Sequence, residues 1–306
     1  MTFTGKLKNE ICSLDISRVA MLSELSAMIR YGADVKGDTL LFRFENAFVA
    51  RRVYKNIKSC FNVSCHIIVR NQKRFRMKQI YLLELKNALE ILNILHVFEN
   101  MKREFFSDPE EMVAFVRGAF LMTGSVNDPA TSGYHLEYVF DLKKEAVFFD
   151  SLLHEMKFES KMTKRSGKWM VYLKNSEDIS DMIRMFETPN CLFYFEDVRI
   201  YRDHKNMVNR LNNCEIANQE KSTRTGLEQL KVISYLKEHD LVDLLDEHCQ
   251  IVLTYREKYP ESSFSELAEI ISMETGYSIG KSGVNHHFIK MKKLMEKDLN
   301  RKEKAS

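Results

Sequence analysis

Two stretches of the chain, about a hundred residues apart, show the same succession of apolar patterns. The first has helical spacing over residues 16–30 and 47–61, interleaved with strand-like segments at 40–44, 65–69 and 80–85. The second has helical spacing over 112–121 and 144–156, with strand-like segments at 134–140 and 169–173. Such repetition rarely arises by accident of composition. We therefore predict an αββαββ unit that occurs twice, as two lobes related by a pseudo-twofold axis.

The length of 306 residues exceeds what one hydrophobic core usually organises, so a further folding unit is expected. After Arg210 the composition turns polar and rich in asparagine, which favours a linker at 209–226. The chain is thus divided into a first lobe at 1–100, a second lobe at 101–208, the linker, and a helical domain at 227–306. The fold class is α+β, followed by an all-α domain.

The six cysteines are scattered without a C-x-x-C pair or a matched histidine spacing, so neither disulfides nor a metal site is predicted, and no cofactor is expected. No apolar run approaches the roughly 18 residues that a membrane helix needs. The first residues lack the apolar segment of a secretion signal. These features indicate a cytoplasmic protein without a membrane partner.

Basic residues gather at equivalent places in the two repeats. The turn between the last two strands of each lobe is predicted to carry Arg70, Lys73, Arg74, Arg76 and Lys78 in the first lobe, and Lys161, Lys164, Arg165 and Lys168 in the second. Two cationic hairpins on one side could straddle the phosphates of a duplex. The alternative is that these side chains only protect strand edges.

The last eighty residues show the pattern of a helix-turn-helix. Ser263 and Glu266 form an S-x-x-E capping box that opens a short helix, and a turn at Gly276 separates it from a helix at 281–297. The second helix has one apolar stripe, formed by Val284, Phe288, Met291 and Met295. Its opposite face is polar and cationic, as expected for a helix that enters the major groove.

The residues predicted to contact DNA follow from this pattern. They are Ser265, Lys281, Ser282, Gly283, Asn285, His286, His287, Ile289, Lys290, Lys292 and Lys293. Asn285 suits an adenine edge, and the lysines suit phosphates. The neighbouring His286 and His287 point in different directions on a helix, so no metal pair is expected, and one of the two should be partly packed. A basic amphipathic helix that binds another protein is the alternative.

Three motifs carry a resemblance to a known family. The segment 117–129 (RGAFLMTGSVNDP) with 134–137 (YHLE), the segment 213–218 (NCEIAN) and the segment 281–286 (KSGVNH) resemble those of WhiA proteins. The family is built on the LAGLIDADG homing-endonuclease fold, and the resemblance spans nearly the whole chain. It implies that two helices pack through small residues, here Ser26 and Ala27 against Gly118 and Ala119, because only small side chains allow the backbones to approach.

The resemblance also exposes what is missing for nuclease chemistry. LAGLIDADG nucleases place an acid before the terminal glycine of each paired helix, where it holds a divalent metal at the scissile phosphate. Here those positions are Tyr31 and Thr123. Asp34 and Asp128 follow a few residues later and offer a relocated metal site as the alternative, which is not favoured because Asp34 is interpreted as a turn residue and Asp128 precedes Pro129 in a loop. No catalytic residue, metal or nuclease activity is therefore predicted.

The resemblance implies a non-enzymatic protein that binds double-stranded DNA and regulates transcription, linked to cell division and chromosome segregation and, in filamentous relatives, to sporulation. It would lie in the cytoplasm, at the nucleoid. His287 and Ile289 stand where the family usually carries arginines, so a weaker affinity or another target site is expected. The competing hypotheses are a sigma-region-like module that contacts RNA polymerase or another regulator, a residual LAGLIDADG endonuclease, and a small-molecule sensor. The sequence sets no oligomeric state.

Overall fold

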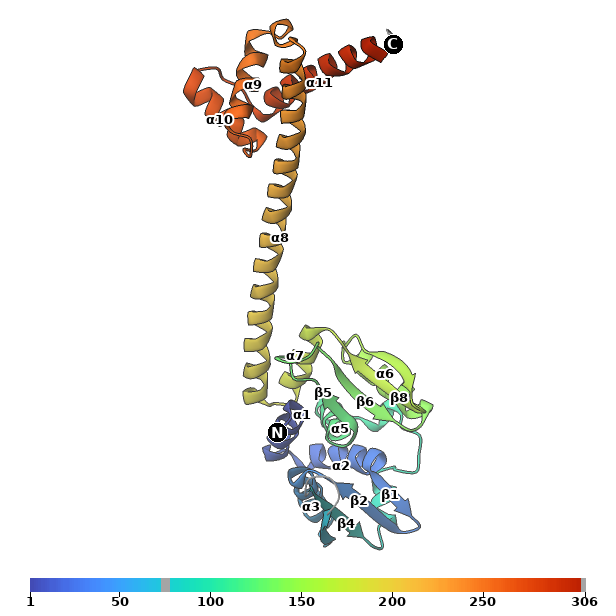
Figure 1. Ribbon diagram of the computed structural model, residues 1–306. Helices are drawn as coiled ribbons and strands as arrows, with labels where there is room; N and C mark the ends of the chain where they lie inside the picture. The colour runs from blue at the N-terminus through green and yellow to red at the C-terminus, as the bar shows by residue number, and fades with distance from the viewer. Residues whose placement is uncertain (73–77, 304–306) are drawn as a thin grey trace. The chain divides into compact units, whose positions relative to one another are not determined.

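The predicted repeat is present in the topology of the computed structural model, most of whose helices and strands are labelled in Figure 1. The first lobe consists of α2 (Arg18–Gly32), β1 (Ala33–Lys36), β2 (Thr39–Phe44), α3 (Ala47–Phe61), β3 (His66–Gln72) and β4 (Lys78–Leu85). The second consists of α5 (Pro109–Thr123), β5 (Gly124–Val126), β6 (Leu136–Phe140), α6 (Lys143–Glu155), β7 (Lys161–Arg165) and β8 (Lys168–Leu173). The sheets are antiparallel and have the same order, β1-β2-β4-β3 and β5-β6-β8-β7. The α+β class with a duplicated αββαββ unit is confirmed.

The structure describes residues 1–72 and 78–303, which divide into the units Met1–Arg202 and Asp203–Ser306. The first unit holds both lobes together with α1 (Phe3–Ser13), α4 (Leu89–Ile94), a 3-10 turn (Arg103–Phe105), α7 (Ser176–Met185) and the start of α8 (Pro189–Glu238). The second holds the rest of α8, a 3-10 turn (Val242–Leu244), α9 (Glu247–Lys258), α10 (Phe264–Thr275) and α11 (Lys281–Glu303). No helix of the described chain is long and apolar enough to cross a membrane.

Each sheet buries one face and exposes the other. Leu40, Phe42 and Phe44 of β2 are buried and alternate with more exposed neighbours, and β6 shows the same alternation. Successive side chains of a strand point to opposite faces, so this pattern gives each sheet an inner and an outer face. The inner faces pack on helices of their own lobes and form one continuous core for Met1–Arg202.

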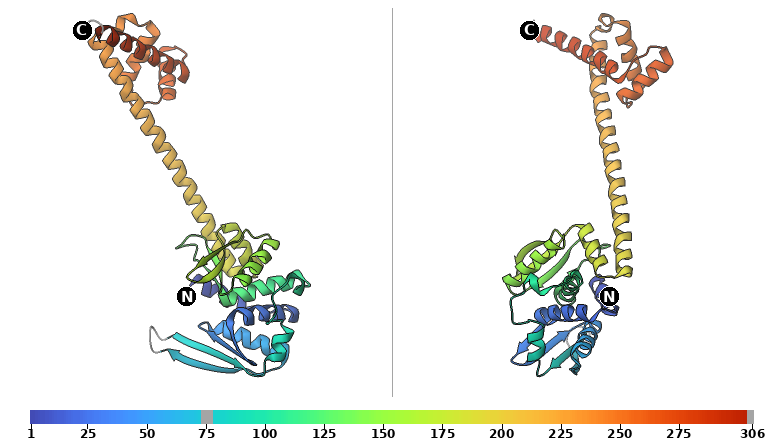
Figure 2. Two further views of the ribbon diagram at one scale, coloured as in Figure 1. Left: turned by 90° about the vertical axis from the view of Figure 1, so that its right-hand side faces the viewer. Right: turned by 180° about the vertical axis from the view of Figure 1, so that it is seen from behind.

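Helices α2 and α5 lie side by side where the two lobes meet (Figure 2). A Cβ atom at Gly118 would lie 2.3 Å from the carbonyl oxygen of Glu24 and 3.1 Å from Cβ of Ala27, which is too close for any side chain. The predicted close approach through small residues is therefore present at Gly118 and Ala27. Ser26 has another contact, because its hydroxyl donates to the carbonyl of Leu95 at 3.0 Å.

The helical unit has its own core, which includes Leu236 of α8, Val252 of α9, Leu267 of α10 and Met291 of α11. The predicted capping box is present, with both reciprocal hydrogen bonds between Ser263 and Glu266. Gly276 ends α10 at a φ of 73°, in the left-handed region that favours glycine. These features confirm the helix-turn-helix arrangement of α10 and α11.

The predicted linker at 209–226 has a different form in the structure. These residues lie inside α8, which is continuous from Pro189 to Glu238. The polar composition predicts an irregular segment, but the segment contains no proline, and its exposed polar side chains are compatible with a solvated helix. Gly226 serves packing, because a Cβ atom there would lie 2.3 Å from the carbonyl oxygen of Pro260.

The predicted basic turn of the second lobe is also different. Lys161, Lys164 and Arg165 belong to strand β7, and Lys168 begins β8. The turn itself is only Ser166-Gly167, with φ of 50° and 82°, as expected for a two-residue hairpin with both φ angles positive. In the first lobe Arg70 lies on β3 and Lys78 begins β4. Lys73, Arg74 and Arg76 lie outside the described residues.

Candidate nucleic-acid interface

Tyr31 and Thr123, which stand at the two acid positions of the nuclease fold, both have structural contacts. The ring of Tyr31 lies edge-on to Phe115, Phe140 and Phe149, with the nearest ring centroids 5.0 Å apart. Burial, with the nearby carboxylate of Glu145 as a second cause, raises the pKa of Tyr31 well above its ordinary value. The hydroxyl of Thr123 donates to the carbonyl of Ala119 at 3.1 Å.

The two nearby acids also have other partners. Asp34 was predicted to be a turn residue, but it lies in strand β1, paired with Leu41 of β2, because the turn of this hairpin falls after Lys36. Asp34 is exposed and forms an ion pair with Lys36 at 3.3 Å. Asp128 accepts hydrogen bonds from the Tyr194 hydroxyl at 2.9 Å and from the backbone N–H of Ala130 at 3.0 Å, and it lies in a loop before Pro129, as the sequence predicted. The divalent metal that the nuclease fold implies needs carboxylate oxygens gathered at the helix ends. The residues present there do not fit such an ion.

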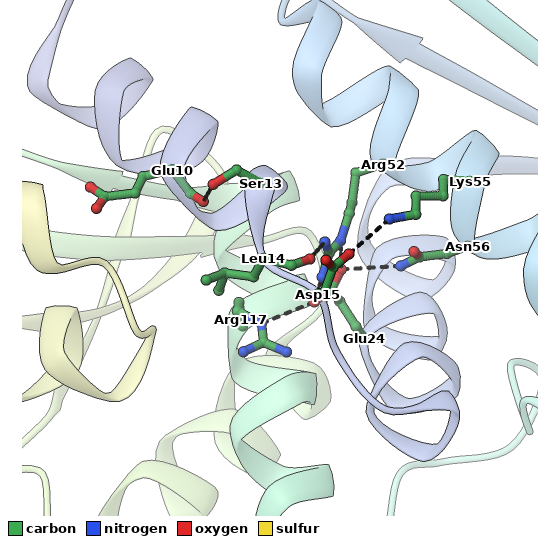
Figure 3. A network of polar contacts seen from close by, with 9 residues as sticks. All are labelled: Glu10, Ser13, Leu14, Asp15, Glu24, Arg52, Lys55, Asn56 and Arg117. Atoms are coloured by element: carbon green, nitrogen blue, oxygen red, sulfur yellow. Dashed lines mark hydrogen bonds and ion pairs between the residues drawn. The ribbon is translucent and has the colours of Figure 1, made fainter.

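A buried polar network between the lobes was missed by sequence reasoning. Figure 3 shows Glu24 of α2 between Arg52 of α3 and Arg117 of α5. Glu24 is 0% exposed, and its carboxylate oxygens lie 2.8 Å from Nε of Arg52 and 2.9 Å from Nε of Arg117. Asn56 donates to the same carboxylate at 3.1 Å, and Arg52 also donates to the carbonyl of Leu14. The available signal was that Glu24 is the single acid of this helix and stands next to Leu25 and two positions from Leu22.

The outer faces of the two sheets carry acidic, basic and uncharged side chains together. The strand register places Asp34, Leu41, Glu84 and His66 in one row of the first sheet and Ser125, Glu137, Tyr172 and Lys161 in the equivalent row of the second. The cations of the β7-β8 hairpin are exposed, but Lys168 pairs with Asp141 at 3.1 Å and Lys164 lies over the ring of Trp169. These faces are not uniformly positive.

The predicted contact face of α11 is largely exposed. Val284 and Met291 are 0% exposed and Phe288 is 6% exposed, and Met295 packs partly against the same core. The predicted contact residues that the structure leaves exposed are Ser265, Lys281, Ser282, Asn285, His286, Ile289, Lys290, Lys292 and Lys293. Gly283 is half-buried, and a Cβ atom there would lie 2.8 Å from Cγ1 of Ile279, so this glycine serves the turn.

His287 and Lys290 have partners inside the helical unit. His287 is the partly packed member of the histidine pair, with its Nε2 atom 3.5 Å from the Tyr277 hydroxyl. Burial is the largest cause that lowers the pKa of His287. Lys290 forms an ion pair with Asp246, and this contact lowers the pKa of Asp246 and raises that of Lys290. To contact a DNA phosphate, the ammonium group of Lys290 would therefore have to leave the carboxylate of Asp246.

A pocket of about 460 Å³ lies at the starts of α10 and α11, and sequence reasoning did not identify two of the basic residues that line it. The pocket is lined by Ser265 and Lys281, which were predicted, and by Lys221 and Arg256, which were not. Arg256 is only 1% exposed and donates through Nη1 to three carbonyl oxygens of the turn at 259–262. Cations and free backbone N–H groups at helix starts are suited to an anion such as a phosphate.

The fold defines a class of protein. Its members join a duplicated LAGLIDADG-like scaffold, with a close helix pair, to a helix-turn-helix domain. Family models match three parts of the chain. They are the WhiA N-terminal LAGLIDADG-like domain at residues 18–98, the WhiA LAGLIDADG-like domain at 112–205 and the WhiA C-terminal HTH domain at 208–295.

Whole-chain comparisons agree with these matches. The chain is 35% identical over 308 residues to the "Probable cell division protein WhiA" of Staphylococcus haemolyticus (strain JCSC1435), covering 97% of both. The crystal structure of full-length DUF199/WhiA from Thermatoga maritima has the same fold, with a TM-score of 0.58 at 21% identity over 97% of this chain and 99% of that one. An N-terminal LAGLIDADG domain of DUF199/WhiA gives a TM-score of 0.51 at 22% identity, covering 60% of this chain and 90% of that one. The chain belongs to the WhiA family.

Proposed function

We propose that this chain is a non-enzymatic DNA-binding regulator of transcription that reads DNA with α11. The observation that carries this proposal is the two-sided character of α11, with an apolar stripe buried on the helical core and a polar, cationic face left exposed. This is the arrangement of a recognition helix that enters the major groove. By family membership we place its role in cell division and chromosome segregation, with the protein in the cytoplasm at the nucleoid.

The proposal assigns different tasks to the exposed residues. Asn285 offers both an acceptor and donors to an adenine edge, whereas Lys292 and Lys293 are suited to phosphates. Ser265 and Lys281 line the pocket at the helix starts, where a backbone phosphate would meet N–H groups and the cations of Lys221 and Arg256. These contacts would orient α11 on the duplex, and the base-facing residues would supply the sequence preference.

A salt titration tests whether α11 carries the phosphate contacts. The double variant Lys292→Ala/Lys293→Ala should bind a mixed-sequence duplex more weakly, and the slope of log K against log salt should flatten by about 2, since each phosphate contact contributes about 0.9. Fluorescence anisotropy of a labelled duplex measures both. The matched control is Lys237→Ala/Lys258→Ala, which removes two cations that pair with Glu257 and Glu274 outside α11. An unchanged slope in the first variant would remove α11 from the interface.

We also propose that the lobes have no nuclease activity. Support comes from the two positions that a nuclease fills with metal-holding acids, where the ring of Tyr31 packs against Phe140 and the hydroxyl of Thr123 donates to the carbonyl of Ala119. Supercoiled DNA incubated with the protein and Mg²⁺ or Mn²⁺ should remain uncut. Cleavage that Asp128→Asn abolishes would show a relocated metal site and overturn this part of the proposal.

A second candidate function, contact with RNA polymerase or another regulator, is favoured by one feature of the first lobe. Edge strand β3 exposes Ile67, Ile68 and Val69, which are 47%, 44% and 54% exposed. Apolar side chains on an open strand edge are a common surface for a protein partner. Co-purification with RNA polymerase that survives nuclease digestion and is lost in Ile68→Lys would favour this function.

A further inference from the structure

Three residues of the helical unit bring metal-ligand atoms together. Asp246 and Cys249 stand at the start of α9, and His287 stands on α11. One ligand atom from each lies within 4.8 Å of the other two, and no other such group of three is found within residues 1–72 and 78–303. The three donors are a carboxylate, a thiol and an imidazole. They come from two helices, and Cys249 and His287 are 38 residues apart in the sequence.

The local structure explains why these atoms converge. Asp246 is the N-cap of α9 and accepts the backbone N–H of Cys249 at 2.8 Å, so the two side chains share one side of the first turn. Cys249 is 0% exposed, and its sulfur donates to the carbonyl oxygen of His287 at 3.7 Å. Packing of α11 on α9 therefore carries the His287 ring to the Cys249 sulfur.

The imidazole of His287 is in a state that suits a metal ligand. Its Nδ1 atom is buried and has no hydrogen-bond partner in the described part of the chain. Burial is the largest cause that lowers the pKa of the ring, with Asp246 acting against it and His286, Lys290 and His248 acting with it. A neutral imidazole binds a metal through a ring nitrogen, and a buried nitrogen without a partner is costly unless something binds it.

We propose that Asp246, Cys249 and His287 bind a divalent transition-metal ion of the zinc class. Thiolate sulfur with imidazole nitrogen favours zinc or cobalt over magnesium and calcium, which prefer oxygen. On binding, the Cys249 thiol releases its proton to solvent and donates a sulfur lone pair to the ion. Asp246 gives up its ion pair with Lys290, and a water completes four-coordination.

The test is a cobalt titration of the intact chain, kept reduced and first stripped of metal with a chelator. We expect one equivalent of Co²⁺ to produce a near-ultraviolet thiolate-to-cobalt charge-transfer band and the visible bands of four-coordinate cobalt, both bleached by Zn²⁺. Cys249→Ser should lose the charge-transfer band, and the matched control Cys214→Ser, which removes an exposed thiol on α8, should keep it. A wild-type chain without these bands, or a band that persists in Cys249→Ser, overturns the proposal.

A second variant guards against misfolding of Cys249→Ser, whose sulfur is buried in the helical core. Asp246→Asn keeps an acceptor at the N-cap, so α9 should remain capped, but it removes the carboxylate ligand. Its affinity for Co²⁺ should fall at least about tenfold with an unchanged circular dichroism spectrum. Equal affinities of Asp246→Asn and wild type would contradict the assigned ligand set. Because no DNA enters the measurement, its outcome is independent of the proposed DNA binding.

Discussion

Glu24 is fully buried between Arg52 of its own lobe and Arg117 of the other lobe, so its carboxylate forms one of the ion pairs that join the lobes. A buried carboxylate loses hydration, which only close and hydrogen-bonded partners offset. Here Arg52, Arg117 and Asn56 supply those partners from α3 and α5. Removing the charge leaves two guanidinium groups close together in the core, so the network is expected to be sensitive to single substitutions.

The first prediction concerns this network. Glu24→Gln should lower the free energy of unfolding of Met1–Arg202 by about 3 kcal/mol, because it leaves buried arginine charges without a counterion. Urea unfolding followed by the fluorescence of Trp169, the single tryptophan, reports on this unit. Glu99→Gln, which removes an exposed partner of His96, should change stability by less than about 1 kcal/mol. Equal effects of the two variants would show that the buried network is not specially stabilising.

The second prediction concerns His287 and pH. Its folded-state pKa lies below the ordinary value of 6.5, so on acidification the unfolded chain takes up the proton first. Stability of the helical unit should therefore be full above about pH 6.5 and fall as the pH decreases toward the lowered folded pKa. Urea unfolding followed by circular dichroism at about pH 7.5 and 5.5 measures the loss. His287→Gln should lose less between the same two pH values, and an identical loss would exclude His287 as its source.

At the scale of helices and strands, two glycines set distances between packed elements. Gly118 lets α5 approach α2, and Gly226 lets α8 approach the turn at 259–262. Both lie inside helices, where glycine by itself is unfavourable by about 1 kcal/mol relative to alanine. Packing and helix propensity therefore act in opposite directions at both positions.

A third prediction uses Gly118. Gly118→Ala should destabilise Met1–Arg202 by about 1–3 kcal/mol, because its Cβ would meet the backbone carbonyl of Glu24 and force the helices apart. Trp169 fluorescence in a urea titration provides the measurement. Stabilisation by the substitution would mean that α2 and α5 tolerate a wider spacing.

A fourth prediction uses Gly226. It tests whether residues 209–226 form a packed helix, as in the structure, or a flexible linker. Gly226→Ala should destabilise the helical unit by about 1–3 kcal/mol, since its Cβ would lie 2.3 Å from the carbonyl oxygen of Pro260. Asn213→Ala, at an exposed position of α8, should instead stabilise slightly through helix propensity. Circular dichroism in urea compares the two. A flexible segment at 209–226 would leave both variants unchanged.

At the scale of the whole molecule, the two units differ in how charge is distributed on their exposed faces. The outer faces of the sheets carry Asp34, Glu84 and Glu137 among their cations, whereas the exposed face of α11 is cationic without an acid in its first turn. Acids close to a phosphate backbone oppose binding. The distribution of charge therefore favours the helical unit as the main DNA contact.

The fifth prediction follows from this distribution. The triple variant Lys161→Ala/Lys164→Ala/Arg165→Ala should keep nearly the wild-type salt dependence of DNA binding, because the second-lobe hairpin is not a main contact. The same anisotropy titration that tests α11 gives the slope. A slope reduced by about 2.7, the value for three lost phosphate contacts, would place the lobe on the duplex and restore the straddling hypothesis.

The sequence by itself determined the duplicated αββαββ topology, the helix-turn-helix and the absence of acids before Gly32 and Gly124, because these depend on local periodicity, caps and residue identity. The exposed face of α11 followed from helical spacing alone. Only the tertiary structure decided the Glu24 network and the meeting of Asp246 and Cys249 with His287. These depend on contacts between residues far apart in the chain, and local patterns carry no information about which distant side chain will supply a partner. The continuous α8 is a different case, because its hydrogen bonds are local and a polar, solvated helix has the same composition as a linker.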